Sequence, residues 1–373
     1  MIFGRLQSRK KSSEPCLCNK KLASNLLSSL FEKGWKQCVR KTPMSIVNDF
    51  SAAVLDIDAP AETGQIVSGI RNSLRNDLKR RGLVVGISGG IDSSVTAALA
   101  VRALGKERVF GLEMPERHSS TETTAHSRTV IEHLGIASLR VDISPVLEVV
   151  GAYQHYDDAV RRVIPEYGNG WKSKIVIANV FDSKGFSLSS LVAQDPDGSI
   201  FRVRLSLKPY LEIVAATNFK QRTRKMLEYY HADRLNFAVA GTPNRLEYDQ
   251  GFFVKLGDGA ADIKPIAHLY KTQVYQLAAY LGIPESIRNR LPTTDTYSLP
   301  QGQDEFYFSL PYPLMDICLF AKNHGIAPKK TAAATGLSPE QVNRVYDDID
   351  TKRSTTRYLH RKAILLQEIP GVG

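Results

Sequence analysis

The first third of the chain alternates between apolar patterns typical of a helix and of a strand. Between residues 62 and 80 apolar side chains recur every four positions, which predicts an amphipathic helix. A short apolar run at residues 83–85 follows and predicts a buried strand, and a helical pattern resumes at Val95. The intervening Gly89-Gly90 therefore lies in a turn that joins a strand to a helix N-terminus.

The same alternation continues to residue 143. Segments 108–114 and 137–143 have strand patterns, and between them residues 121–134 have a helical pattern that ends at Gly135. Strand and helix units of this length form right-handed crossovers within a parallel sheet. We therefore expect an α/β fold with three α/β/α layers around a doubly wound parallel sheet, of the kind that binds ligands at the carboxyl ends of its strands.

A region from about 167 to 210 interrupts the alternation. Segments 174–180 and 199–207 are strand-like, and the turn residues Asp195-Pro196-Asp197-Gly198 separate them, so we predict an inserted β-hairpin. Beyond it the pattern predicts a helix over 219–230, a strand over 236–240 and a helix over 271–280. A last helix over 339–349 opens with the capping box Ser338-Pro339-Glu340-Gln341.

Positive charge is concentrated at the N-terminus. The 373 residues carry a formal charge of +11, and residues 1–43 hold ten Lys or Arg against two Asp or Glu, so that +8 lies there. We predict a basic, loosely ordered extension over 1–43, a catalytic domain over 44–330 with the insertion at about 167–210, and a C-terminal helical extension over 331–373. From Met44 on the sequence is typical of an enzyme N-terminus, so Met44 is a candidate for the authentic start.

Composition limits the class of protein. No apolar run reaches the roughly 18 residues that a membrane span needs, so we expect a soluble protein without a membrane partner. Cys16, Cys18 and Cys38 lie in the basic extension and only Cys318 lies beyond it, which argues against a disulfide framework and for a reducing cytoplasm. Because the rest of the chain carries only +3, nucleic acid is not the expected partner. The alternative that is not an enzyme is a nucleic-acid-binding protein that keeps the fold only for structure.

The turn after the first strand has the features of an anion site. Its adjacent glycines let backbone N–H groups approach phosphate oxygens, and the unpaired amides and dipole of the following helix favour negative charge. A tight turn capped by Asp92 or Ser93 is the alternative that these residues alone leave open. The string Ser88-Gly89-Gly90-Ile91-Asp92-Ser93-Ser94 resembles the pyrophosphatase loop (PP-loop) of adenylating enzymes, and the Gly-x-x-x-x-Gly-Lys-Ser/Thr phosphate loop is absent.

Motifs in the second half make this resemblance more specific. They are Asn218-x-Lys220-x-Arg222-x-Arg224, Gly241-Thr242-Pro243-Asn244-Arg245-Leu246-Glu247, Leu256-Gly257-Asp258-Gly259 within 251–266, Leu269-x-Lys271, Pro292-Thr293-Thr294-Asp295 and Gly302-Gln303-Asp304-Glu305. In this order, and together with the loop, they resemble NAD synthetase from about residue 62 to residue 316.

The resemblance implies a reaction. ATP would activate the nicotinate carboxylate of deamido-NAD as an acyl-adenylate, and ammonia would displace AMP to give NAD, AMP and pyrophosphate. Residue chemistry agrees, because a carboxylate is a poor electrophile until activated and because magnesium and lysines can neutralise phosphate charge. An amidating ligase of the same fold that acts on a different carboxylic acid is the nearest alternative.

The resemblance also implies roles for individual residues. Asp92 and Lys271 would be catalytic, Asp92 and Glu247 would bind Mg²⁺, and deamido-NAD would be met by Arg222, Arg224, Lys255, Asp258 and Asp262. ATP would contact Gly86, Ile87, Ser88, Gly89, Gly90, Ile91, Asp92, Ser93, Thr242, Lys271 and Thr293. Without the resemblance, Glu247, Lys255, Asp258 and Lys271 would be interpreted as ordinary helix, loop and turn residues.

Some features depart from the family pattern. Leu246, Ala260, Thr294 and Thr296 replace residue types usual in the family, and the insertion has no counterpart in its compact bacterial members. Glutamine-dependent members carry an additional amidase domain with a Glu-Lys-Cys centre, and about 60 residues precede the first predicted helix, too few to build one. We therefore expect free ammonia as the donor, unless a separate glutaminase docks. The resemblance further implies a homodimer.

Overall fold

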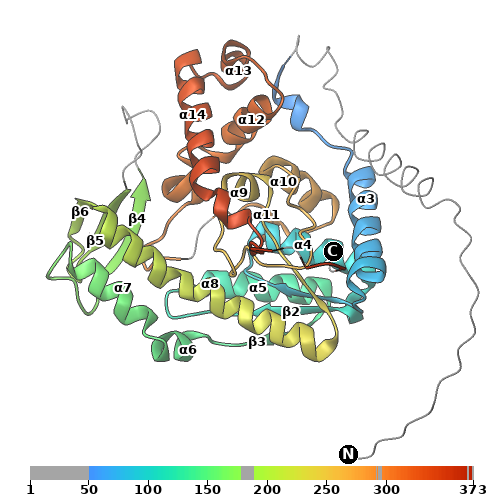
Figure 1. The fold of residues 1–373 in the computed structure, drawn as a ribbon, viewed down its shortest axis with the longest axis horizontal. Helices are drawn as coiled ribbons and strands as arrows, with labels where there is room; N and C mark the ends of the chain where they lie inside the picture. Colours follow the sequence, from blue (N-terminus) through green and yellow to red (C-terminus); the bar gives the residue numbers. More distant parts are fainter. Residues whose placement is uncertain (1–49, 178–188, 291, 293–295, 368, 372–373) are drawn as a thin grey trace, which may run out of the picture. The chain divides into compact units, whose positions relative to one another are not determined.

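A parallel sheet with the strand order β3-β2-β1-β7 forms the centre of the fold. Figure 1 labels its strands β2 and β3. Its strands are β1 (Leu83–Gly86), β2 (Val109–Glu113), β3 (Ala137–Arg140) and β7 (Ala238–Ala240). In this computed structural model the described residues are 50–177, 189–290, 292, 296–367 and 369–371, so the predicted extension over 1–43, the candidate start Met44 and Thr293 lie outside them. β1 pairs in parallel with both β2 and β7.

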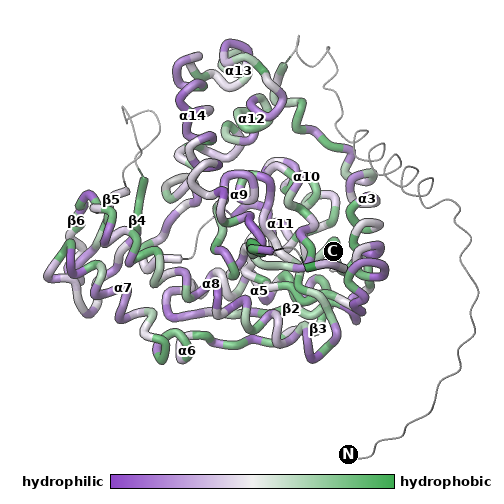
Figure 2. The backbone as a smooth tube through the Cα atoms, viewed as in Figure 1, coloured by the Kyte–Doolittle hydropathy of each residue, from purple (hydrophilic) through white to green (hydrophobic). Residues whose placement is uncertain are grey.

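Helices cover both faces of the sheet, because alternate residues of each strand point to opposite sides. Leu83 and Val85 of β1 pack in one core, with α3 (Ala59–Asn72), α4 (Ile91–Leu104), α5 (Thr121–Leu134) and α10 (Lys271–Tyr280). Val84 packs in the other, with α6 (Ser144–Val149), α7 (Ala152–Arg161) and α8 (Leu207–Leu235). The predicted three-layer α/β/α fold is confirmed. Figure 2 shows the outer helices alternating between hydrophilic and hydrophobic residues, as expected of helices that bury one face.

The inserted region forms a three-stranded antiparallel sheet rather than the predicted hairpin. Its strands are β4 (Lys172–Ile177), β5 (Ser189–Gln194) and β6 (Ile200–Arg204), with β5 in the middle. The turn at Asp195–Gly198 joins antiparallel strands as predicted, and Asp195 Oδ1 accepts a hydrogen bond from the backbone N–H of Ser199 (2.8 Å). The prediction was wrong about the partner strand, because the short β5, which opens with two serines, carries a weak strand pattern.

Helix α8 is longer than predicted. It runs for 29 residues from Leu207 to Leu235 and ends at Asn236, whose φ of 55° is left-handed. Pro209 lies in its first turn, where the missing N–H is tolerated. The motif from Asn218 to Arg224 therefore lies in the middle of a long helix and not at its start, so its side chains are presented by a rigid element.

The C-terminal part adds α12 (Tyr312–Asn323), α13 (Pro328–Thr335) and α14 (Pro339–Thr356), followed by a single turn at Arg357–His360. The predicted capping box opens α14: Gln341 N donates to Ser338 Oγ (3.2 Å) and Ser338 N donates to the Gln341 side chain (2.8 Å). The helix extends past the predicted end at 349. These helices belong to the same compact unit as the sheet.

Short helical segments complete the described chain. They are Ala52–Leu55, Ser73–Leu78, Lys106–Arg108, α9 (Arg245–Gln250), α11 (Glu285–Arg288) and Asp304–Phe308. Among the helices in the described ranges, none is both long enough and apolar enough to cross a bilayer.

Candidate functional site

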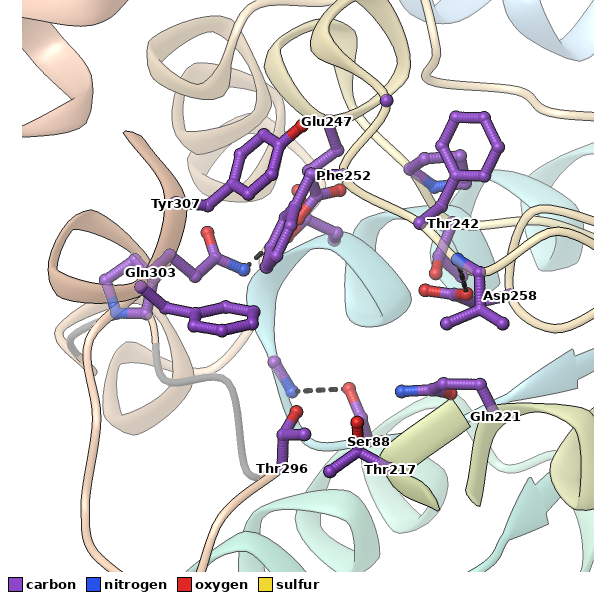
Figure 3. Close-up of a pocket in the computed structure, with 18 of the residues that line it drawn as sticks. Ser88, Thr217, Gln221, Thr242, Glu247, Phe252, Asp258, Thr296, Gln303 and Tyr307 are labelled. Atoms are coloured by element: carbon purple, nitrogen blue, oxygen red, sulfur yellow. Dashed lines mark hydrogen bonds between the residues drawn. The ribbon is translucent and has the colours of Figure 1, made fainter. Parts of the chain in front are cut away.

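A cavity of about 1190 Å³ lies at the carboxyl ends of the central strands. It is lined by the loop after β1, by Glu113 at the end of β2, by Gly241 and Thr242 after β7, and by residues of α8 and α14. Pockets for one small ligand measure about 300–1,000 Å³, so this cavity has room for more than one nucleotide-sized ligand. Figure 3 shows Ser88, Thr217, Thr242, Glu247 and Asp258 around the cavity.

The inserted sheet forms part of the cavity wall. Ile175 and Ile177 of β4 and Ser189 of β5 line it, and Tyr210 at the start of α8 lies on the lining as well. This wall is largely apolar, in contrast to the charged residues that α8 and α14 contribute.

The loop after β1 leaves a helix N-terminus open to the cavity. Gly89 has a φ of +72°, and a Cβ atom there would come within 2.7 Å of the Ser127 backbone nitrogen, so this turn requires glycine. Ser93 Oγ donates to the Gly90 carbonyl (3.0 Å) and accepts from the Ser88 backbone N–H (3.3 Å). Because no side chain caps the first turn of α4, its amides are available to an anion.

Asp92 is held by partners from two distant segments. The ammonium of Lys271, at the start of α10 and only 2 % exposed, forms an ion pair with Asp92 Oδ2. Asn244 Nδ2 donates to Asp92 Oδ1 over 3.1 Å. Burial lowers the pKa of Lys271, but the carboxylates of Asp92 and Glu247 outweigh it and raise that pKa above its ordinary value. Lys271 is therefore a buried cation beside the open helix N-terminus.

Glu247 lies beside this ion pair, in the first turn of α9. Its Oε2 accepts a hydrogen bond from the Asn244 backbone N–H (3.1 Å), and its Oε1 accepts one from Gln303 Nε2 (3.1 Å), as Figure 3 shows for Gln303. Burial, reinforced by the Asp92 carboxylate, raises the pKa of Glu247 to about 8. Two neighbouring carboxylates, one of them buried, favour a nearby cation.

The chemistry of this pair fits Mg²⁺. Within the described parts of the chain, no group of three or more His, Cys, Asp or Glu side chains is arranged to hold a metal ion. An ion bound by Asp92 and Glu247 would therefore complete its shell with water and ligand oxygens. Mg²⁺ is commonly bound in this way, through one or two carboxylates together with substrate phosphates.

Four further predicted residues line the cavity. Arg222 Nε donates to the Lys255 carbonyl (3.4 Å) and Arg224 Nε to the Met114 carbonyl (3.2 Å). Lys255 Nζ donates to the carbonyl of Tyr358 in the C-terminal turn (3.0 Å). Asp258 Oδ1 accepts from the Val254 backbone N–H (2.7 Å), and burial raises its pKa. Arg222, Arg224 and Lys255 therefore contribute three positive charges to the cavity lining.

Most predicted site residues come together in the cavity. Gly89 supports the loop from outside the lining, and Asp262 also lies off the lining. Asp262 accepts hydrogen bonds from the Val239 backbone N–H (2.7 Å) and from Tyr229 OH (3.3 Å), so it braces β7. The predicted residues on the lining are Gly86, Ile87, Ser88, Gly90, Ile91, Asp92, Ser93, Arg222, Arg224, Thr242, Glu247, Lys255, Asp258 and Lys271.

Sequence reasoning missed Lys225 and Glu228, which also line the cavity and form a buried ion pair (2.6 Å). A Lys and a Glu three positions apart usually form a solvated surface pair. The sequence nevertheless contained a signal, because positions 218, 221, 222, 225 and 228 are spaced as residues on one face of a helix. If Arg222 lines the cavity, Lys225 and Glu228 are expected to line it as well. Asn244 and Gln303 belong to motifs of the sequence, and the motifs alone assigned no role to either residue.

Comparisons with known proteins identify a family for the chain. The NAD synthase family model matches residues 62–171 and 195–357, and the gap contains β4 and β5. The NH(3)-dependent NAD(+) synthetase of Mesorhizobium japonicum is 58% identical over 316 residues, which cover 85% of this chain and 99% of that protein. The enzyme of the same name from Rhizobium meliloti is 59% identical over 320 residues, covering 86% of this chain and 96% of that protein.

Solved structures share the fold. An NMN synthetase from Francisella tularensis aligns with a TM-score of 0.57 and 22% identity, covering 83% of this chain and 99% of that one. An NH3-dependent NAD synthetase from Campylobacter jejuni, in complex with nitrate ion, aligns with a TM-score of 0.54 and 22% identity, covering 83% of this chain and all of that one (100%).

Proposed function

Because the chain belongs to the NAD synthase family, we propose that it catalyses the ATP-dependent amidation of deamido-NAD, with ammonia as the nitrogen donor. The products are NAD, AMP and pyrophosphate. The observation that carries the proposal is that an open helix N-terminus, the Asp92–Lys271 ion pair and the arginines of α8 line one cavity. Its volume suits ATP and a dinucleotide together.

In the ATP half, the loop after β1 binds phosphate. The amide of Gly89 and the amides of the first turn of α4 donate to phosphate oxygens, and the helix dipole adds to this attraction. Lys271 neutralises negative charge as pyrophosphate leaves. Thr242, which follows β7, contacts the nucleotide. Thr293 lies outside the described residues, and its place near the phosphates rests on the sequence alone.

Asp92 and Glu247 would hold Mg²⁺ in this half of the site. The ion, when bound, neutralises charge on the phosphate oxygens of ATP. Asn244 and Gln303 fix the two carboxylates that would receive it.

In the acid half, Arg222, Arg224 and Lys255 meet the phosphates of deamido-NAD, and Asp258 meets its polar groups. Asp262 contributes indirectly by bracing β7. Holding the nicotinate carboxylate against the α-phosphorus of ATP replaces a bimolecular encounter with an oriented one, which contributes strongly to catalysis. Ammonia then displaces AMP from the acyl-adenylate.

Ammonia is the proposed donor because the described residues offer no glutaminase nucleophile. Cys318 is the only cysteine among them, it is buried in α12, and burial raises its pKa to about 12. Such a thiol does not form the thiolate that attack on glutamine requires. Ammonia is taken from solution or from a separate glutaminase, and we further propose that the enzyme works as a cytoplasmic homodimer.

The test is a reconstituted reaction. With ATP, Mg²⁺, ammonium and deamido-NAD we expect NAD, AMP and pyrophosphate in equal amounts, and glutamine in place of ammonium should give no NAD. If the deamido-NAD carboxylate carries ¹⁸O, label should appear in AMP. Pyrophosphate release with another carboxylic acid, and none with deamido-NAD, would instead identify a ligase of different specificity.

A further inference from the structure

A buried ion pair on α8 lines the cavity, and the proposed reaction assigns it no role. Lys225 and Glu228 are each only 6 % exposed, and Lys225 Nζ lies 2.6 Å from Glu228 Oε2. Placing two charges out of water is costly, and a pair that only stabilised the helix could be replaced by apolar residues. Its position on the cavity wall indicates a role toward a ligand.

The second oxygen of this carboxylate is free. No described residue donates a hydrogen bond to Glu228 Oε1, since Lys225 engages Oε2 alone. A Cβ atom built on Gly86 would lie 2.9 Å from Oε1, so this oxygen lies against the end of β1, and glycine keeps the space beside it open. An acceptor without a donor therefore lies where the phosphate-binding loop begins.

The charges around Glu228 determine which kind of ligand group can bind beside it. Burial raises the pKa of Glu228, and the ammonium of Lys225 opposes this rise. Asp258 adds a second negative group and Arg224 a positive one. A carboxylate in this place repels phosphate oxygens and only accepts hydrogen bonds, so it suits a neutral group with O–H donors. The vicinal hydroxyls of a ribose are such a group, and acidic residues bind them in other nucleotide-binding α/β folds.

The position within the sheet also suits a ribose. β1 has β2 on one side and β7 on the other, so the strand order reverses here, and ligands of open α/β sheets bind at such reversals. Ser88 follows Gly86 by two residues, which corresponds to about 7 Å of extended chain. A nucleotide whose phosphate is bound by the amides near Ser88 therefore has its sugar within reach of Glu228.

We propose that Glu228, held in place by Lys225, accepts hydrogen bonds from ribose hydroxyls in this cavity and makes the enzyme select ribonucleotides over deoxyribonucleotides. The inference deepens the proposed function and rests on it. The ribose belongs either to ATP or to the dinucleotide, and the chemistry of recognition is the same.

The test compares ligands with and without the hydroxyl. We would measure kcat/KM for ATP, 2′-deoxyATP and 3′-deoxyATP, and for deamido-NAD and its 2′-deoxyadenosine analogue, in the wild type, E228Q and E228A. The wild type should favour the ribose form of one of the two substrates by about tenfold, the value of one hydrogen bond to a charged group. In E228A this ratio should fall to about one, and in E228Q it should be intermediate. The substrate whose ratio changes identifies the source of the ribose.

A purely structural role gives a different result, because it lowers kcat/KM for ribose and deoxyribose forms alike and leaves the ratio unchanged. That outcome would overturn the inference. Glu228→Ala leaves Lys225 buried without a partner, so the double variant K225M/E228Q, which removes both charges, provides the measurement if the single variant does not fold. E212Q makes the same change on the same helix outside the cavity and should leave the ratio at the wild-type value.

Failure of the proposed function looks different. A wild-type protein that forms no NAD with any of these nucleotides contradicts the proposed function. A wild-type protein that forms NAD, with ratios that E228A does not change, contradicts only the role of Glu228.

Discussion

Asn244 donates its side-chain N–H to Asp92 across 3.1 Å while its Oδ1 caps α9. The same oxygen accepts the backbone N–H groups of Leu246 (2.9 Å) and Glu247 (3.2 Å). One residue thus fixes both carboxylates to which we assign Mg²⁺: the Asn244 side chain holds Asp92, and the Asn244 backbone N–H donates to Glu247 Oε2 (3.1 Å). Asn244 and Asp92 lie 152 residues apart in sequence.

Replacing Asn244 by alanine should impair both stability and turnover. Loss of the N-cap costs about 1 kcal/mol of unfolding free energy, and the freed Asp92 no longer holds one orientation, so kcat should fall by more than the stability loss explains. The control is D58A, which removes the N-cap of α3 (Asp58 Oδ1 to Ala61 N, 3.0 Å) away from the cavity. Denaturant unfolding and steady-state kinetics compare the two. Equal kcat in both variants would exclude the orienting role.

Asp92→Asn should abolish adenylation and also destabilise the protein. The substitution leaves the ammonium of Lys271 buried without its counter-charge, and breaking a buried pair costs about 3–5 kcal/mol; since Asp92 is partly exposed, we expect the lower end. Pyrophosphate release and thermal unfolding measure the two effects. The double variant D92N/K271M removes both charges and should recover much of the lost stability while remaining inactive. A double variant as unstable as D92N would show that the ion pair is not the cause.

Glu247 should make stability depend on pH. Its pKa of about 8 in the folded protein exceeds the ordinary value of 4.5, so between these values the native state binds more protons than the unfolded state. The free energy of unfolding should therefore fall as pH rises from about 4.5 to about 8, and E247Q should lack this contribution. Unfolding at several pH values gives the difference between wild type and E247Q, with E285Q, an exposed glutamate of α11, as control.

Binding of Mg²⁺ supplies an independent measurement on the same residue. A cation favours the ionised carboxylate, so adding Mg²⁺ near pH 7 should release protons and stabilise the wild type. In E247Q, Mg²⁺ should release fewer protons and stabilise the protein less than in the wild type. Proton release of the same size in both proteins would remove Glu247 from the metal site.

The two loop glycines should differ in their response to alanine. Gly89 has a φ of +72° and a built Cβ atom 2.7 Å from the Ser127 backbone nitrogen, whereas a Cβ atom at Gly90 meets only the flexible Ser88 Oγ at 3.3 Å. Gly89→Ala should cost about 1–3 kcal/mol through backbone strain and raise the KM for ATP strongly. Gly90→Ala should have a smaller effect. Thermal unfolding and ATP kinetics test this order, and G64A, with no atom near its Cβ position, is the control.

Lys255→Ala should raise the KM for deamido-NAD more than the KM for ATP. We expect roughly tenfold, the value of one charge-assisted contact to a phosphate. K329A, an exposed lysine of α13, is the control for loss of one positive charge. If the KM for ATP changes more, Lys255 belongs to the ATP half of the site.

Elements with strong local signals were predictable from the sequence. The helix predicted over 121–134 is α5, with Ser120 as its N-cap and Gly135 in the left-handed conformation at its end. The loop after β1 was predictable for the same reason, because glycines between an apolar run and a helical pattern restrict the chain to few conformations.

Features that depend on distant contacts were not predictable in this way. β5 has little strand character by itself and owes its place to pairing on both sides with β4 and β6. The role of Asn244 depends on a hydrogen bond to Asp92, and the Lys225–Glu228 pair lies on a helix that packs against β1, with Gly86 beside Glu228. Tertiary packing determines these features, and a short window of sequence carries no information about such distant contacts.

The inserted sheet offers a route to selective inhibition. A compound anchored in the nucleotide cavity could extend an apolar group toward Ile175 of β4 and Tyr210, a wall built partly by the segment that the NAD synthase family model leaves unmatched. Such a compound would gain affinity for this enzyme through surface that lies partly outside the match to the family model, while its polar end occupied the nucleotide part of the cavity.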